Sequence, residues 1–376
     1  MKKFLTLLLI ISAHSLSAQN FLPKFIKRMY FNNDTSKRST FVVLPVIASA
    51  PETGFEAGGT ALLSFYTDTV DRNTRVSNVF GFVTATTKGQ NRFSISTNYW
   101  GPHNKNYYAA TISYQNFPFD FYGVGNNTRL ADADHVSEKR FKFNLTGQTL
   151  AGSHLYVGYV AGAFDYKYSN KNSAGVLFTD PLVEDRAGGT SFFVGPTVVY
   201  DSRNNNTYTT KGLIITSYFN IMQGVFGNNS YRGGFFNIEY SQFFSLSKKF
   251  VLGVDIQEQS LTGGRSPFYL LPQLGNDEVM RGYYGGRYRD RNLLAGQTEL
   301  RYRLNGRIGV VAFVGTGEVF HSEFSFPGLK PDYGAGLRYF FDVDKGLALR
   351  MDYGIGQKPA GEPRESGFYV SLGQSF

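Results

Sequence analysis

The sequence of 376 residues contains no cysteine and few of the side chains that usually carry catalysis or bind metals. Without cysteine, the chain can form neither disulfide bonds nor thiolate metal sites. Its five histidines show no paired spacing suited to zinc. A Gly-x-Ser-x-Gly motif, which surrounds the nucleophile of many hydrolases, is absent. We therefore expect no enzyme activity, no metal and no cofactor.

Long apolar runs are absent beyond the first residues. No later stretch reaches the roughly eighteen consecutive apolar residues that a membrane-spanning helix requires. The opening stretch, residues 1–19, combines Lys2 and Lys3 with a short apolar run and the small residue Ala18 near its end. This pattern is typical of a secretory signal peptide and predicts an exported protein.

Residues 20–40 precede the first strand-like run and admit two interpretations. Apolar residues recur at helical spacing between basic ones, which predicts a short amphipathic helix at a membrane surface. The alternative is a poorly ordered leader. A segment of roughly twenty residues leaves no room for a separate domain.

Tyrosine, phenylalanine and glycine are abundant, with 25, 35 and 42 residues respectively. This composition favours many short β-strands over helices. A transmembrane β-barrel can have a mean hydropathy as low as −0.24 because only alternate residues of each strand need be apolar. We attribute the formal net charge of +9 to lumen and loop side chains, because an exported chain is not expected to bind nucleic acid.

The stretch 277–304 shows how charged and apolar residues are arranged. Its first half is loop-like, rich in glycine and arginine and without an apolar period. From position 295 onward, polar residues occupy 297, 299, 301 and 303, whereas Leu300, Tyr302 and Leu304 share the other parity. In a soluble sandwich the polar face would meet water. In an outer-membrane barrel it would line a wet lumen, and the apolar face would meet lipid.

Strand-like runs recur throughout the rest of the chain, and their connections favour the barrel. Short turns alternate with long loops, as expected when periplasmic turns face external loops, and the number of strands is even. We therefore predict a single all-β domain over residues 41–376, a 16-stranded antiparallel transmembrane β-barrel in the bacterial outer membrane. The predicted strands are 41–48, 55–68, 75–87, 91–100, 106–116, 138–150, 153–168, 190–200, 211–221, 234–245, 249–260, 294–304, 308–317, 333–342, 347–356 and 367–376.

Several stretches between positions 201 and 376 match the motifs of one family. Arg281, Gly282 and Tyr283 match a tripeptide of its sixth external loop, and Gly296 with Glu299 match the strand that follows. Further matches are Asp201–Asn204 with Thr209–Gly212, Gly334–Arg338 and Leu349–Gly354. The chain thus resembles the outer-membrane assembly-factor superfamily, the bacterial surface antigen barrels. The resemblance implies that the long sixth external loop folds back into the lumen, and that the protein acts in membrane biogenesis or translocation.

The chain departs from the family pattern in two places. Family members usually carry an aspartate in the strand after the Gly-x-x-Glu strand, where this chain has Gly315. The Arg281 contact should then rest mainly on Glu299. Insertase and secretion members also carry polypeptide-transport-associated repeats before the barrel, whereas this sequence resembles the barrel-only members.

Two groups of charged residues are candidates for function in the lumen. Arg281 could pair two-pronged with Glu299, which faces the lumen by parity, and so hold the loop inside the barrel. The alternative is an exposed loop arginine without a fixed partner. The second group shares lumen-facing parity and would form either an electropositive passage or internal ion pairs that stiffen the wall. Its members are Arg301, Arg303, Arg338, Arg350 and Asp352.

The seam between the first and last strands is the other candidate. Pro45 cannot donate a ladder hydrogen bond, and Gly373 permits a kink near Phe376, the aromatic residue at the end of the last strand. Together they could ease sideways opening, or Pro45 could simply end regular pairing at the rim.

Two functions remain open from the sequence. One is an assembly or translocation barrel in contact with outer-membrane lipid, acting on unfolded outer-membrane proteins or through a separate periplasmic partner chain. The other is a passive or gated pore for small anionic solutes. A partner chain that co-purifies and carries the missing repeats would favour the first.

Overall fold

The computed structural model describes residues 38–50, 54–71, 73–226 and 231–376. Sixteen strands form one antiparallel sheet in which strands that follow each other along the chain are paired, so the predicted fold is confirmed. Each predicted strand overlaps an observed one. The strands are β1 (Thr40–Ala50), β2 (Gly54–Phe65), β3 (Ser77–Thr86), β4 (Asn91–Trp100), β5 (Asn106–Phe121), β6 (Asp134–Leu150), β7 (Leu155–Ser169), β8 (Gly188–Asp201), β9 (Gly212–Phe226), β10 (Arg232–Ser245), β11 (Phe250–Gly263), β14 (Asn292–Arg303), β15 (Ile308–Phe320), β16 (Lys330–Asp342), β17 (Leu347–Ile355) and β18 (Ser366–Leu372).

Alternation along each strand separates an apolar outer face from a polar inner face. On β8, Phe192 and Val194 are 49% and 56% exposed, whereas the side chains of Ser191 and Thr197 on the other parity are buried. Successive side chains of a strand point to opposite sides of the sheet. The outer surface is therefore the apolar surface that lipid contact requires.

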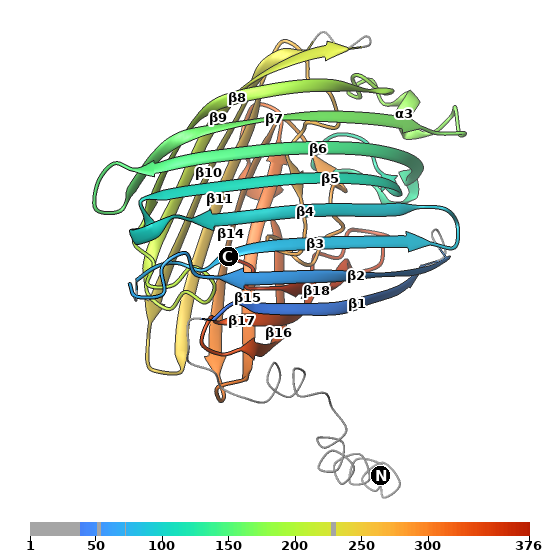
Figure 1. The fold of residues 1–376 in the computed structure, drawn as a ribbon. Helices are drawn as coiled ribbons and strands as arrows, with labels where there is room; N and C mark the ends of the chain where they lie inside the picture. The colour runs from blue at the N-terminus through green and yellow to red at the C-terminus, as the bar shows by residue number, and fades with distance from the viewer. Residues whose placement is uncertain (1–37, 51–53, 72, 227–230) are drawn as a thin grey trace, which may run out of the picture.

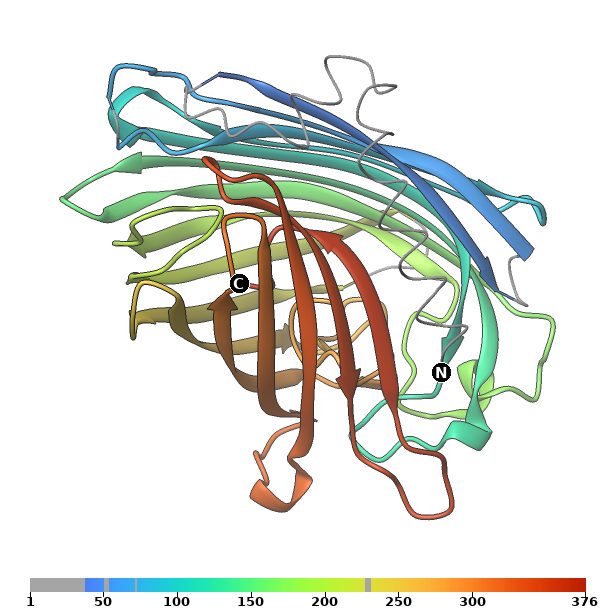
Figure 2. The ribbon, with the colours of Figure 1, turned by 90° about the horizontal axis from the view of Figure 1, so that it is seen from below.

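The sheet curls until its two ends meet (Figures 1 and 2). Val42 of β1 packs in one buried apolar cluster with Phe341 and Leu347 of the last hairpins. Thr40 Oγ1 donates a hydrogen bond to Asp342 Oδ2 at 2.6 Å. The ladders of the described residues run from β1 to β18, and these side chains join the two ends.

The connection between β11 and β14, residues 264–291, lies inside the barrel, and we call it the lumen loop (Figure 2). It contains the small strands β12 (Gln273–Leu274) and β13 (Tyr288–Arg289), which pair with each other. Phe268, Met280 and Tyr283 of this loop have no exposed surface. Their burial shows that the predicted sixth external loop is folded inward.

Short helices occur only in connections among the described residues. They are η1 (Pro102–Asn104), η2 (Leu130–Asp132), α3 (Val176–Thr179) and η3 (Phe326–Gly328). No helix in the described part of the chain is long and apolar enough to cross a membrane. The predicted signal peptide, residues 1–19, and nearly all of the predicted leader, residues 20–40, lie outside the described residues.

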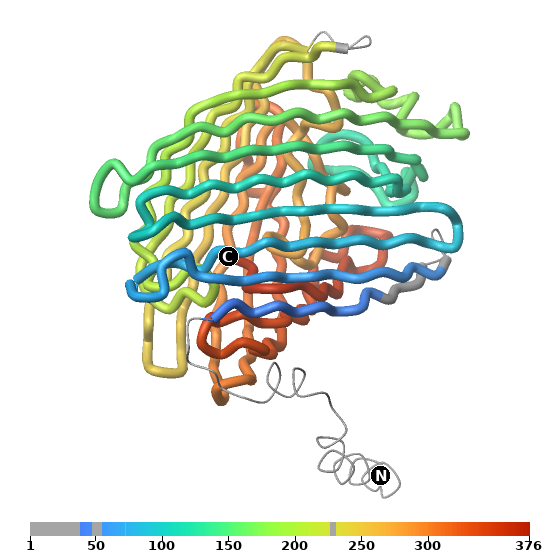
Figure 3. The backbone as a smooth tube through the Cα atoms, viewed as in Figure 1, coloured from blue at the N-terminus to red at the C-terminus, as the bar shows by residue number. Residues whose placement is uncertain are grey.

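The end of the last strand differs from the prediction. The alternation predicted a strand to position 376, but β18 ends at Leu372. Gly373 adopts φ 92°, a left-handed conformation that other residues rarely take, and the chain leaves the sheet there. Phe376 therefore does not extend the outer face, and its ring lies 5.8 Å from the ring of Phe243, which is buried. The backbone trace in Figure 3 follows this path to the terminus.

Candidate functional site

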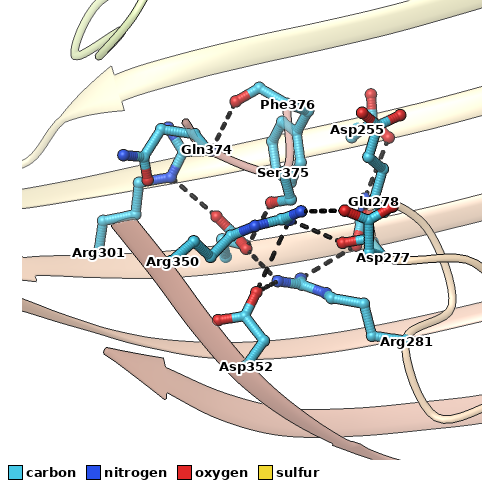
Figure 4. Close-up of polar contacts among 12 residues, drawn as sticks. Asp255, Asp277, Glu278, Arg281, Arg301, Arg350, Asp352, Gln374, Ser375 and Phe376 are labelled. Atoms are coloured by element: carbon cyan, nitrogen blue, oxygen red, sulfur yellow. Dashed lines mark hydrogen bonds and ion pairs between the residues drawn. The ribbon is translucent and has the colours of Figure 1, made fainter. Parts of the chain in front are cut away.

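Arg281 of the lumen loop is fully buried, and two carboxylates bind it (Figure 4). Its Nη1 donates hydrogen bonds to Glu299 Oε1 and to Asp352 Oδ2, both at 2.7 Å. Its Nη2 donates to Gln297 Oε1 at 3.2 Å, and the guanidinium carbon lies 3.5 Å from the ring centroid of Phe313. One loop side chain thus joins strands β14 and β17, which are not neighbours in the sheet.

Local sequence explains why these carboxylates reach the arginine. Glu299 and Asp352 both lie on the inward parity of their strands, as the alternation predicts. Gly336 lies opposite Asp352 in the β16–β17 ladder. A Cβ atom at Gly336 would lie 1.8 Å from Asp352 Oδ1, so the missing side chain makes room for the carboxylate.

Three further arginines surround the same carboxylates. Arg301 Nε donates to Glu299 Oε2 at 2.8 Å, and Arg338 forms an ion pair with Asp352. Arg350 Nη2 donates to Asp277 Oδ2 at 2.7 Å, a second contact between the barrel wall and the lumen loop. We call this set the lumen ion cluster; its members are Asp277, Arg281, Glu299, Arg301, Arg338, Arg350 and Asp352.

The lumen ion cluster includes four of the five residues predicted to line the lumen. Arg303 is the exception, because its guanidinium lies 3.3 Å from the ring centroid of Phe340 and 4.9 Å from that of Tyr208. It also donates hydrogen bonds to Asn305 O and Gly306 O of the β14–β15 turn. The pairing of the other arginines with carboxylates favours internal ion pairs over an electropositive passage.

The expectation that Arg281 rests mainly on Glu299 was wrong, because Asp352 makes an equally short contact. Gly315 also has a structural role, since it lies opposite Asp332 of β16 in the ladder. A Cβ atom at Gly315 would lie 2.5 Å from Asp332 Oδ1. Asp332 Oδ2 accepts a hydrogen bond from the backbone N–H of Gly282 at 3.4 Å. The carboxylate near the tripeptide therefore comes from β16, and not from β15, which carries Gly315.

The other two residues of the tripeptide also contact the last strands. A Cβ atom at Gly282 would lie 2.4 Å from the backbone nitrogen of Gly356. Tyr283 is fully buried, and its hydroxyl donates to Pro331 O at 2.5 Å. The structure thus brings Arg281, Gly282 and Tyr283 together against β16 and β17.

Comparison with known families identifies this arrangement. The profile of the Omp85 superfamily domain matches residues 81–376. The chain belongs to the Omp85 superfamily. It is an outer-membrane β-barrel protein of that superfamily.

Solved structures share this fold at low sequence identity. BamA from Haemophilus ducreyi lacking POTRA domains 1–3 matches with 12% identity and a TM-score of 0.55, over 89% of this chain and 70% of that one. CdiB from Acinetobacter baumannii matches with 12% identity and a TM-score of 0.55, over 89% of this chain and 59% of that one. CdiB from Escherichia coli matches with 10% identity and a TM-score of 0.55, over 89% and 62%. The chain therefore spans less than two thirds of either CdiB. A comparison with curated proteins finds no match.

In this Omp85 barrel the residues after β18 bind the lumen ion cluster. The apolar alternation of the sequence had instead predicted that the last strand continues to position 376. Ser375 Oγ donates to Glu299 Oε1 at 2.7 Å, and Arg301 Nη2 donates to Phe376 O at 2.8 Å. Arg338 Nε donates to Gln374 Oε1 at 3.1 Å. Phe376, predicted as a seam residue, therefore lies at the lumen ion cluster because these hydrogen bonds draw the chain inward.

The two other seam residues of the Omp85 barrel lie at the ends of the sheet. Pro45 lies in β1 opposite Gly59 of β2. Gly373 follows β18, and its backbone N–H donates to Ala348 O of β17 at 2.8 Å. β18 has seven residues and β1 has eleven, so the two edge strands differ in length.

At the outer end of the Omp85 barrel, the lumen loop binds the β17–β18 loop. Arg287 forms ion pairs with Glu362 and with Glu365, the second at 3.3 Å. Tyr288 also donates a hydrogen bond to Glu365 Oε1 at 2.7 Å. Glu362 accepts hydrogen bonds from Arg287 and from the backbone of Leu130, and both lower the pKa of its carboxyl.

Within the described residues, no three His, Cys, Asp or Glu side chains form a group that could hold a metal ion. The cluster's chemistry is that of charge pairing, which fixes one loop against the wall.

Proposed function

We propose that this protein is a non-enzymatic assembly or translocation barrel that opens between β1 and β18 to admit polypeptide. Membership of the Omp85 superfamily supports a role in outer-membrane biogenesis or transport. The observation that carries the proposal of opening is the weak junction between the two ends of the sheet. β18 pairs with β17 over only seven residues before the chain turns inward at Gly373.

Few polar contacts hold the two ends of the sheet together. Thr40 at the start of β1 donates to Asp342, and Lys345 Nζ donates to Thr40 Oγ1 at 2.6 Å. Lys345 Nζ also lies 5.9 Å from the ring centroid of Tyr66, just after β2, and the ends meet in the apolar cluster that contains Val42 and Leu347. Side-chain contacts of this kind are easier to separate than a backbone ladder, in which alternate residues of each strand exchange pairs of hydrogen bonds.

The occupied lumen argues against a passive pore for small anionic solutes. The lumen loop lies in the barrel, and Arg281, Arg301 and Arg338 are buried against carboxylates. At the lumen ion cluster the positive charges are paired with carboxylates, whereas an anion-selective passage requires unpaired positive charge that faces water. This observation supports the assembly or translocation role over the pore.

The partners we propose are unfolded outer-membrane proteins, with a separate periplasmic chain as a second partner. The exposed apolar outer face supports outer-membrane lipid as a further partner.

The proposal can be tested with purified protein in liposomes. An unrelated small outer-membrane barrel is added unfolded, and its folding is timed with and without this protein. Because the sequence has no cysteine, cysteines introduced at Pro45 and Gly373 can be joined by a bifunctional thiol reagent. We expect faster folding in the presence of the protein, and loss of this effect after cross-linking.

A matched control places cysteines at Leu44 and Thr60, which face each other in the β1–β2 ladder. Cross-linking this pair should leave the acceleration intact, because these strands are already joined. No acceleration by the uncross-linked protein, together with steady ion conductance, would reject the assembly role for the isolated chain.

A further inference from the structure

A second feature of the lumen is a cavity of about 650 Å³ beside the lumen loop. Inward side chains of β5 to β11 form one wall, and residues 269–273, Gly285 and Arg289 of the lumen loop form the other. No residue of the lumen ion cluster lines it. Its volume lies in the range of cavities that bind organic ligands.

Two cations that line the cavity form no ion pair with the described residues. Lys142 Nζ lies 5.6 Å from the ring centroid of Phe164 and 5.7 Å from that of Tyr166. Arg289 is 3% exposed, and its Nε and Nη2 both donate to one backbone oxygen, Gly286 O, at 3.0 and 2.8 Å. Lys142 is half-buried, whereas Arg289 is fully buried against the rings of Phe119, Phe121 and Phe268. A buried cation without an ion-pair partner is unfavourable unless a bound anion compensates it.

The single carboxylate that lines the cavity is already engaged. Glu138 lies 3.4 Å from Arg140, accepts a hydrogen bond from Gln115 at 3.1 Å and accepts another from the Tyr168 hydroxyl at 3.0 Å. Three cations and one carboxylate therefore leave the cavity with net positive charge. A ligand that fits this cavity carries negative charge.

Side-chain amides supply the other polar groups of the wall. They include Asn144, Asn220, Gln259 and Gln273. Asn220 Oδ1 is buried without a hydrogen-bond partner, although the residue lines the cavity. Amides both donate and accept hydrogen bonds, so they complement hydroxyl groups, and an unpaired acceptor requires a donor.

Flat ring surfaces complete the lining. Tyr218 and Phe235 are half-buried and stacked, with ring centroids 6.4 Å apart and planes at 20°. Phe164 also lines the cavity and is half-buried beside Lys142. Aromatic rings bury apolar area with a defined geometry, and the C–H face of a sugar ring matches such a surface.

We propose that this cavity binds an acidic saccharide, with its carboxylate or phosphate at Lys142 and Arg289, its hydroxyls on the amides and its ring on Tyr218 and Phe235. The binding is independent of the proposed assembly function and adds to it. A free acidic sugar and the headgroup of a phosphorylated glycolipid share this chemistry.

Isothermal titration calorimetry of the full chain in detergent micelles tests the proposal. The probes are trigalacturonate, the neutral trisaccharide maltotriose and the acidic peptide tetraglutamate. We expect saturable binding of trigalacturonate and at least about tenfold weaker binding of maltotriose, because charge-assisted hydrogen bonds are the strong ones. Competition by micelles that contain lipopolysaccharide would identify a glycolipid headgroup as the source, and its absence would favour a free sugar.

Lys142→Gln should weaken trigalacturonate binding about tenfold or more. The matched control is Lys139→Gln on the same strand, which lies on the opposite parity and should bind as the parent does. If Lys142→Gln does not fold, Asn220→Leu provides a second variant that removes the unpaired acceptor, and it should also weaken binding.

Three results would overturn the proposal. They are the lack of saturable binding by any probe, equal affinity of the parent and of the folded cavity variants, and binding of tetraglutamate as tight as that of trigalacturonate. The last result would assign the cavity to acidic polypeptide. None of these results depends on whether the protein accelerates folding of another barrel.

Discussion

The guanidinium of Arg281 contacts carboxylates on two strands that are separated by β15 and β16 in the sheet. An arginine suits this position because its planar group presents several donors in fixed directions, whereas a lysine ammonium is a point charge. Its removal would leave Glu299 and Asp352 buried with fewer cations. Breaking a buried ion pair from one side typically costs about 3–5 kcal/mol.

We predict that Arg281→Ala releases the lumen loop, and that Arg281→Lys does so in part. Limited trypsin digestion measures this, because Arg287, Arg289 and Arg291 lie in the loop and become accessible when it leaves the lumen. Cleavage there should divide the barrel into two fragments. Arg129→Ala serves as the control, since its side chain is 72% exposed and pairs within its own loop. Equal digestion of the parent and Arg281→Ala would contradict the role of Arg281.

Gly282, next to Arg281, must be glycine because the backbone of another segment approaches it closely. An alanine Cβ there would lie 2.4 Å from the nitrogen of Gly356, so backbone must move. We predict that Gly282→Ala lowers the free energy of unfolding by about 1–3 kcal/mol, as overpacking does. Denaturant unfolding in detergent measures this. Gly264→Ala is the control, because its added Cβ would have no neighbour within 4 Å. If both variants unfold alike, the close contact is not important for stability.

At the scale of elements, the lumen loop is fixed to the rest of the barrel at two places. The lumen ion cluster holds its middle, and the ion pairs of Arg287 hold its outer part to the β17–β18 loop. This second contact brings the loop to within one residue of the start of β18, since Glu365 precedes Ser366. Movement of the loop and fraying of the last strand are therefore expected to be coupled.

The outer contact should weaken in acid. The hydrogen bond from Arg287 is the largest cause of the lowered pKa of Glu362. A carboxyl with a lower pKa in the folded protein stabilises it above the ordinary pKa, and this contribution is lost as the pH falls through the folded value. We expect channel conductance in planar bilayers to rise as the pH drops below about 4, the range of an ordinary glutamate. Glu362→Gln should already show the raised conductance at neutral pH, and an identical pH response in that variant would exclude Glu362 as the group responsible.

At the scale of the whole molecule, the sheet must bring β1 back to the last hairpins. Contacts from Thr40 to Asp342 and to Lys345 span more than 300 positions in the sequence and join the ends on the short-turn side. The opposite side has the long loops and the inward-turned lumen loop. The junction therefore depends on a small number of side chains at one end of the barrel.

We predict that Asp342→Asn loosens this junction, because it removes the charge that pairs with Lys345. Hydrogen exchange of the backbone amides in residues 41–46 of β1 should become faster, with little change in the amides of β7. Asp132→Asn, in an exposed loop ion pair, should leave both unchanged. Unaltered exchange in β1 would show that the apolar cluster around Val42 holds the ends by itself.

The sequence determined the strands and their faces. In a strand that faces lipid, alternate residues must be apolar whatever residues lie nearby in the fold. This requirement can therefore be recognised from the local sequence. For that reason the inward parity of Glu299 and Asp352 and the long loop carrying Arg281 were predictable. Only the tertiary structure decided which lumen groups meet. The bond from Arg281 to Asp352, the inward turn of Phe376 and the cavity at Lys142 depend on how sixteen strands curl together, and no local pattern records that curvature.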